Sequence, residues 1–271
     1  MNPHISIPRQ HGGPSSFGGT TRQESFRMPR FFKRLFKFPQ MDFEMAIWEM
    51  TSLLIAPKKV FRSIYYHKQT KNTWHRPDPS FTYLLSFFML LTGLAWGVAS
   101  LHSVAAVVRL TLIFVFVHFL ASSLLLATAA FFLVGRLLGP GVAGLPGRRR
   151  QQGLFARVGA GEQLEFGYCF DVAIRAFFPV WVLLYVVQFL LLPVVSKDYW
   201  ISLFFGNTIY LIALCYYTVI SFLGYNALPF LHHTELLLSP VFVYLALWVT
   251  SLFGFSLPIH IVPLLKLGAG R

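Results

Sequence analysis

The sequence predicts an all-α protein: a polytopic membrane helix bundle with about five transmembrane helices, preceded by cytosolic interfacial helices. Two observations support this fold class. The 271 residues are 55% hydrophobic and only 12% charged, whereas about 25% of the residues of a soluble domain are charged. Several apolar runs are also longer than the ~18 residues that identify a membrane-spanning helix. The chain is therefore expected to pack its core inside a bilayer.

Residues 1–40 are expected to form a disordered basic cytosolic tail, because their Gly-, Ser- and Pro-rich composition cannot bury enough apolar surface to fold. Residues 27–38 (RMPRFFKRLFKF) mix cations with aromatic rings. This mixture suits anionic lipid headgroups, or RNA, or a cluster that only sets membrane topology. With three arginines of a later loop, the candidate lipid or RNA contacts are Arg27, Arg30, Lys33, Arg34, Lys37, Arg148, Arg149 and Arg150.

Residues 41–78 are predicted to be a cytosolic interfacial helical region. Asp42, Glu44 and Glu49 interrupt the apolar residues, so no run there is long enough to cross a bilayer. A second helix is expected to begin at Pro57, since proline suits a first helical turn. Asp42 and Glu49 share one helix face and Glu44 lies nearly opposite, so the first helix lacks a single wet side.

The membrane domain is predicted to cover residues 79–260. Its five spans are expected at about 81–101, 110–134, 172–195, 206–231 and 236–257. Residues 135–164 are expected to form a flexible basic loop, and residues 261–271 a lumenal tail. His118, inside the second span, is either a functional group or a neutral histidine bonded to a neighbouring helix. The second interpretation is favoured, because no acidic partner lies in the interior of a predicted span.

The start of the third span carries an acid–base pair. Asp171 and Arg175 are four residues apart and are expected to pair on one helix face. They are read either as a helix cap at the membrane edge or as part of a recognition surface. Cys169 beside them is a weak candidate for lipidation. In the fourth span, Tyr216 and Tyr217 are expected to pack and hydrogen-bond between helices.

Lysine and arginine counts set the expected orientation. Residues 1–78 hold thirteen and the loop 135–164 holds five, which places both, and the link between the fourth and fifth spans, in the cytosol and the C-terminus in the lumen. Three patterned segments then converge on the cytosolic interface as a predicted docking surface. Its candidate residues are Asp42, Glu44, Phe166, Tyr168, Asp171, Arg175, Gly224, Tyr225, Asn226 and Pro229.

Catalysis is not expected from this sequence. It has no nucleophile–base pair at usable spacing, no metal-ligand framework and no phosphate-binding glycine motif, so no catalytic, cofactor or metal site is predicted. A transporter or lipid-handling protein is an alternative, but neither an internal repeat nor a chain of intramembrane carboxylates is present. Its polar candidates are His118, Gln188 and Asn207.

Several ordered blocks resemble the uncoordinated-fifty (Unc-fifty) family of Golgi multi-pass membrane proteins, which looks related to the five-span Yip-type trafficking proteins. The blocks are MDFE (41–44), KQTK (68–71), RPDPSF (76–81), FGYCFDV (166–172), AFFP (176–179) and GNT…YY…FLGYNALPFL (206–231). The resemblance covers about residues 40–260, and the Gly/Arg-rich loop 138–161 departs from it.

The resemblance implies a non-enzymatic Golgi protein of vesicular transport. Its implied partners are a large Sec7-type Arf guanine-nucleotide exchange factor, which it helps to recruit, and membrane-protein cargo such as some nicotinic receptors. RNA binding is also attributed to the family. Together with the charge pattern, these expectations describe a scaffold in the Golgi membrane that contacts anionic lipids at its cytosolic face.

Overall fold

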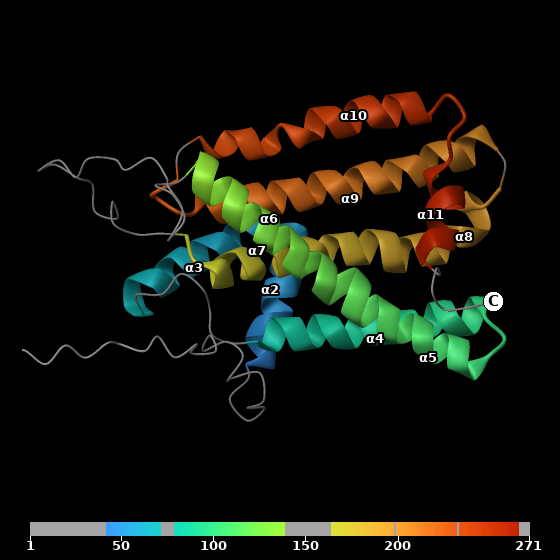
Figure 1. Ribbon diagram of the computed structural model, residues 1–271, viewed down its shortest axis with the longest axis horizontal. Coiled ribbons are helices and arrows are strands. Elements are labelled where there is room, and N and C mark those ends of the chain that lie inside the picture. The colour runs from blue at the N-terminus through green and yellow to red at the C-terminus, as the bar shows by residue number, and fades with distance from the viewer. Residues whose placement is uncertain (1–41, 72–78, 139–163, 198, 232, 266–271) are drawn as a thin grey trace, which may run out of the picture.

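The computed structural model describes residues 42–71, 79–138, 164–197, 199–231 and 233–265 (Figure 1). Every regular element in these ranges is helical, and five helices are long and apolar enough to cross a membrane, so the predicted fold class is confirmed. The expected tail 1–40 and most of the basic loop lie outside the described residues. The candidate lipid or RNA contacts at 27–37 and 148–150 therefore stay a prediction.

The five spans come in chain order, and two of them contain a π-helical segment. They are α4 (Ser80–Ser100); α5 (Val104–Ile113), η2 (Phe114–Ala121) and α6 (Ser122–Leu137); α7 (Phe166–Trp181), η3 (Val182–Val187) and α8 (Gln188–Val195); α9 (Trp200–Asn226); and η4 (Thr234–Leu238) with α10 (Pro240–Ser251). Helices α2 (Phe43–Ile55) and α3 (Pro57–Lys71) precede the spans, and α11 (Leu257–Leu265) follows them.

Several span boundaries differ from those expected. The second span begins at Val104 and the third at Phe166, earlier than predicted. The third begins earlier because Asp171 and Arg175 pair with each other inside the helix and so do not end it. The fourth ends at Asn226, because Pro229 disfavours helix in the residue before it. The last span ends at Ser251, and Gly254, with a φ of 128°, separates it from the unexpected helix α11.

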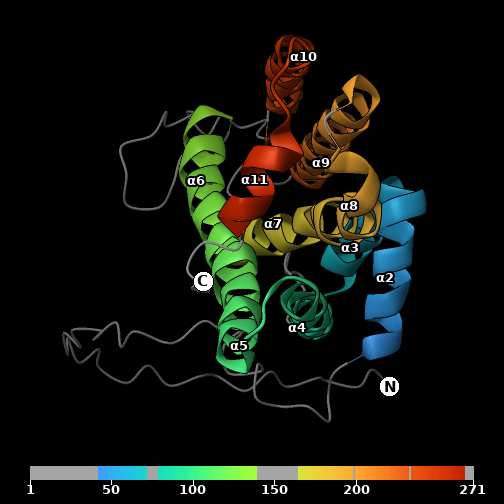
Figure 2. The same cartoon turned by 90° about the vertical axis from the view of Figure 1, so that its right-hand side faces the viewer.

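Helices α2 and α3 are confirmed as separate helices, with α3 beginning at the predicted Pro57. The spans run side by side, and α2 lies across them (Figures 1 and 2). We call the end of the bundle that holds the start of α7 and the end of α9 the junction end, because α2 and α3 pack there. The opposite end, which faces the viewer in Figure 2, holds the α4–α5 turn, the α8–α9 turn and α11.

Indole groups bind α4 to the span formed by α7, η3 and α8. The Trp96 Nε1–H donates to the Tyr185 carbonyl at 2.9 Å, and the Trp181 Nε1–H donates to the Thr92 hydroxyl at 3.1 Å. The Trp181 ring also stacks on Phe88, with 5.4 Å between centroids. Because a polar group without a partner is costly inside a bilayer, these bonds fix how the two spans pack.

The Gly-Asn-Thr block at 206–208 is a packing motif at the opposite end. A Cβ atom on Gly206 would lie 2.5 Å from Pro258 Cγ and 2.8 Å from Val195 Cγ1, so only glycine lets α9 approach α8 and α11 this closely. The Thr208 hydroxyl accepts a hydrogen bond from Trp248 Nε1 at 3.3 Å, which ties α9 to α10.

Asn207 fastens the C-terminal part of the chain to α9. It is fully buried, and its Nδ2 donates to Ser251 Oγ and to the Phe255 carbonyl, each at 2.9 Å. Its Oδ1 accepts from the Leu257 N–H at 2.8 Å. These three bonds explain why a polar side chain is present in this span, and no transport role is needed to explain it.

We predict that Asn207→Leu destabilises the protein, because the Phe255 carbonyl and the Leu257 N–H lose their partner in a partly buried place. Each such loss costs about 1–3 kcal/mol. The Tm of the purified protein in detergent should fall clearly, measured by tryptophan fluorescence. Thr250→Val is the matched control, since that hydroxyl bonds only to Leu247 of its own helix. An unchanged Tm for Asn207→Leu would contradict the fastening role.

Candidate functional site at the junction end

Helix α2 buries one face, and this face contains a carboxylate. Its buried residues are Ala46, Glu49, Met50 and Leu53, at the i, i+3, i+4, i+7 spacing of a single helical stripe. Glu49, expected only to interrupt the apolar run, is therefore an interior residue. The spacing of Glu49 from Ala46, Met50 and Leu53 is the signal in the sequence that indicates an interior position for this residue.

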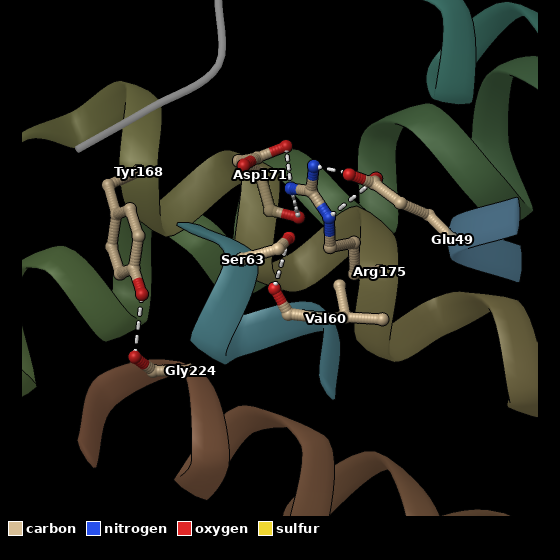
Figure 3. Close-up of polar contacts among 7 residues, drawn as sticks. All are labelled: Glu49, Val60, Ser63, Tyr168, Asp171, Arg175 and Gly224. Carbon is tan, nitrogen blue, oxygen red and sulfur yellow. Dashed lines mark hydrogen bonds and ion pairs between the residues drawn. The ribbon is translucent and has the colours of Figure 1, made fainter. Parts of the chain in front are cut away.

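Arg175 of α7 lies between two carboxylates (Figure 3). Its Nη2 is 3.0 Å from Glu49 Oε2, and its Nε donates to the same oxygen at 3.3 Å. Its Nη1 forms an ion pair with Asp171, one helical turn earlier. The Phe81 ring centroid lies 5.6 Å from the guanidinium carbon, within the range of a cation–π contact. We call Glu49, Asp171 and Arg175 the ion cluster.

The ion cluster connects α2 to the central span. Glu49 and Arg175 are 126 residues apart in sequence, and each side chain is only 3% exposed. An isolated buried charge costs several kcal/mol, so each partner is needed to hold the other in the interior. The predicted Asp171–Arg175 pair is confirmed. The helix-cap interpretation of Asp171 is wrong, because α7 begins at Phe166 and its N-cap position is Glu165.

Two tyrosine hydroxyls bond to carbonyls in the last turns of other helices. Tyr216 of α9 donates to the Leu54 carbonyl of α2 at 2.7 Å, with the Leu53 carbonyl 3.2 Å away. Tyr168 of α7 donates to the Gly224 carbonyl of α9 at 2.6 Å (Figure 3). Carbonyls in a last turn lack the regular partners of a helix interior, so both bonds stabilise helix ends. The Gly224 carbonyl also accepts from the Ala227 N–H at 3.3 Å. The predicted role of Tyr216 as an inter-helix hydrogen-bonding residue is confirmed.

Gly224 permits close packing of three helices. A Cβ atom there would lie 2.9 Å from both methyl groups of Val172 on α7 and 3.2 Å from Phe61 Cε1 on α3. Valine has a restricted χ1 in a helix and cannot easily move aside. Gly224 is therefore needed for the approach of α9 to α7 and α3.

The ten predicted docking residues differ in how exposed they are to the surroundings of the protein. Tyr168, Arg175, Gly224 and Tyr225 are buried, and Asp171 has 20% of its side chain exposed. The exposed residues are Asp42, Glu44, Phe166, Asn226 and Pro229. Direct contact of these four buried residues with a partner does not fit this packing, because they lie between the helices. A docking role for the exposed residues stays a prediction.

The exposed residues lie in two groups. Phe166 belongs to the start of α7, and Asn226 and Pro229 to the end of α9 and the turn after it. Asp42 and Glu44 lie at the beginning of α2, beside the start of α4 and away from the end of α9 (Figure 1). The expected convergence therefore involves the buried residues of the three segments, whereas their exposed residues are separated.

The remaining polar candidates lie within the spans. Gln188 Nε2 donates to the Tyr210 hydroxyl at 2.9 Å. The His118 ring in η2 packs against the rings of Phe114 and Tyr185, with centroids 5.0 and 6.0 Å away. In the described part of the chain its Nδ1 has no hydrogen-bond partner, so the expected bond to a neighbouring helix is not found for that nitrogen.

Cys169 is fully buried. An acyl chain attached to its sulfur would require α7 to separate from the helices around it. Lipidation of Cys169, a weak expectation from the sequence, therefore does not fit this packing.

Five apolar spans, and a crosswise helix joined to them by an ion cluster, define a multi-pass helical membrane protein. The chain belongs to the UNC-50 family, whose model matches residues 31–266. The family expected from the sequence blocks is thus confirmed, whereas the relation to Yip-type proteins stays a prediction.

Three relatives illustrate the match. The chain is 41% identical over 238 residues to the "Protein GMH1 homolog" of Schizosaccharomyces pombe, covering 87% of this chain and 97% of the relative. It is 36% identical to the "Protein unc-50 homolog" of Dictyostelium discoideum, covering 87% and 86%. It is 38% identical to the "Protein unc-50 homolog A" of Xenopus laevis, covering 82% and 80%. No solved structure gives a significant match.

We predict that Arg175→Met destabilises the protein more than Glu49→Gln does. The first variant removes the guanidinium that both carboxylates contact and should cost about 3–5 kcal/mol. The second retains the Arg175–Asp171 pair and loses charge-assisted hydrogen bonds worth about 1.5–3 kcal/mol. Both should lower the Tm of the purified protein in detergent.

Glu44→Gln is the control for these variants, because Glu44 is an exposed acid of the same helix and such changes usually stay within about 0.5 kcal/mol. If Arg175→Met were as stable as Glu44→Gln, the ion cluster would have no role in holding α2.

Proposed function

We propose that this protein is a Golgi membrane protein of vesicular transport that acts as a non-enzymatic scaffold. Its cytosolic face recruits a large Sec7-type Arf guanine-nucleotide exchange factor, and through this it supports the trafficking of membrane proteins, including receptors. Membership of the UNC-50 family supports the proposal, and none of the three relatives' names denotes an enzyme. The structural observation that carries it is the junction end, where a rigid buried framework presents two exposed groups of residues.

The proposed orientation places the junction end in the cytosol. Exposed cations there include Lys58, Lys59 and Arg62 on α3, and Arg136 at the end of α6. Lysine and arginine are enriched on the cytosolic side of membrane proteins. Exposed apolar side chains of α2, such as Ile47 and Trp48, support a location of this helix in the membrane interface, where such rings and chains are favoured.

The orientation can be measured with cysteines introduced one at a time. In a Cys215→Ser background, Glu235→Cys lies in η4 at the junction end and Lys197→Cys in the α8–α9 turn. A membrane-impermeant maleimide should label Glu235→Cys in cells with a permeabilised plasma membrane and intact Golgi membranes, and Lys197→Cys only after detergent. The background protein controls for reaction at buried Cys169. The reverse pattern would contradict the proposed orientation.

Docking is proposed for the exposed residues of the junction end. Phe166 and Pro229 offer apolar contacts, the Asn226 amide offers hydrogen bonds, and Asp42 and Glu44 offer charge. The Asn226 Oδ1 also accepts a bond from Thr234 at 2.9 Å, which orders the link into η4. Rigid presentation reduces the entropy lost on binding, so the buried framework would serve recognition without touching the partner.

The test separates the two exposed groups. One variant combines Phe166→Ala with Pro229→Ala, and another combines Asp42→Asn with Glu44→Gln; asparagine at 42 keeps a good N-cap for α2. We expect at least one variant to reduce the Golgi-bound fraction of the exchange factor by about tenfold, as for a residue central to an interface. The readout is quantitative fluorescence of the exchange factor at the Golgi, relative to the whole cell.

Glu235→Gln serves as the control, since Glu235 is another exposed acid at this end. All variants must reach the Golgi in normal amount and keep the Tm of the parent protein. Full recruitment in both double variants would remove the docking proposal.

RNA binding through residues 27–38 and 148–150 stays a prediction, because these segments lie outside the described residues. Asn207 no longer supports a transport function, because its hydrogen bonds connect α9 to the last residue of α10 and to the chain after it. The scaffold is therefore the function that we put forward.

A further inference from the structure

An apolar groove of about 370 Å³ lies between α2, α4 and α7. This volume is within the range of small-molecule and cofactor sites. Six of its lining residues show its character: Ile47, Leu54 and Ile55 from α2, Phe88 from α4, and Phe178 and Trp181 from α7. The three rings form a continuous aromatic wall, because Trp181 stacks on both Phe88 and Phe178.

The depth of the groove identifies its surroundings. Phe88 and Trp181 lie inside the spans Ser80–Ser100 and Phe166–Val195. The α2 side of the groove is held near the middle of α9, since Tyr216 donates to the Leu54 carbonyl. Ile47, Leu54 and Ile55 line the groove and are nevertheless exposed, so the groove is open at the surface of the bundle. At this depth we expect the surrounding medium to be lipid, whose hydrocarbon chains match the apolar lining.

Positive charge lies beside one end of the groove. Lys58 and Lys59 are exposed in the first turn of α3, three and four residues after Ile55. The positive end of the α3 dipole is in the same place, and helix N-termini favour anions. An anionic phosphate headgroup would thus find attraction where a chain in the groove would end.

We propose that this groove binds one acyl chain of an anionic glycerophospholipid, whose headgroup contacts Lys58 and Lys59. Helix α2 covers the chain from the junction end, and the aromatic wall of α4 and α7 contacts its side. This site goes beyond the scaffold role and does not depend on it. Its occupancy would stabilise the crosswise position of α2, because the lipid chain fills space that α2 would otherwise leave open.

Photo-crosslinking of the full chain in vesicles tests the proposal. The probe is phosphatidylserine with a diazirine in one acyl chain, at low abundance in phosphatidylcholine vesicles, and the labelled residues are mapped by mass spectrometry. We expect labels concentrated on the groove residues of α2 and α7. Labels spread evenly over all lipid-facing spans would overturn the proposal.

A groove-filling variant gives the matched comparison. Thr51 lines the groove, and its hydroxyl bonds only to Ile47 of its own helix. Thr51→Phe should fill the groove and reduce labelling there by about tenfold, the effect of losing a moderate binding contact. Thr128→Phe is the control, because Thr128 makes the same kind of bond to Leu124 on α6 and lies outside the groove.

Thr51→Val keeps the side-chain volume and removes only the hydroxyl. The groove of this variant should be labelled as strongly as that of the parent protein, which would show that loss of the hydroxyl does not cause the reduced labelling in Thr51→Phe. Equal groove labelling in Thr51→Phe and Thr128→Phe would overturn the site.

The headgroup is tested separately. Lys58→Gln with Lys59→Gln should reduce groove labelling by the phosphatidylserine probe by about 25-fold, since each of the two lysines near anionic lipid contributes about fivefold. Labelling by the matching phosphatidylcholine probe should not change. Lys197→Gln, at the opposite end, is the control. If both probes label the groove equally in the parent protein, the anionic part of the proposal is wrong.

Discussion

The arrangement of the junction end depends on one guanidinium group held between two carboxylates. Arg175 lies in the central span, Asp171 one turn before it, and Glu49 on a helix that crosses the spans. None of these charges would be stable in the interior alone, because removal from water costs several kcal/mol for each ion. The cluster therefore fixes the position of α2. The position of α2 in turn determines where Asp42 and Glu44 lie and where the α2 side of the apolar groove lies.

Polar groups elsewhere follow the same constraint. Inside a bilayer, backbone and side-chain polar groups must find partners within the protein. Tyr216 and Tyr168 satisfy carbonyls at the ends of α2 and α9, and Asn207 satisfies a turn between α10 and α11. Each of these bonds joins segments that are distant in sequence. Tyr216 and Asn207, two polar residues of the fourth span, thus join α9 to α2 and to the chain after α10.

The scaffold proposal and the lipid-site proposal involve different residues around the same packed helices. The scaffold role uses exposed residues at the junction end, which are presented by buried neighbours such as Tyr168 and Gly224. The lipid site uses exposed apolar residues of α2, such as Ile47 and Ile55, beside the rings of Trp181 and Phe88. Both depend on the crosswise position of α2, so a change in the ion cluster would disturb both, whereas changes at Pro229 or Thr51 would disturb only one.

The sequence by itself determined the fold class, five spans, the break at Pro57, the Asp171–Arg175 pair and the family. All of these features except the family depend on composition or on residues within a few positions of each other, so periodicity and spacing reveal them. The family was instead inferred from the resemblance of ordered sequence blocks spread over about residues 40–260. Only the tertiary structure decided that Glu49 is the partner of Arg175, 126 residues away, and that Tyr225 and Gly224 are interior residues. Which residues pair over long distances depends on how the helices pack, and no local pattern encodes that pairing. For the same reason the expected docking surface separated into a buried framework and two exposed groups.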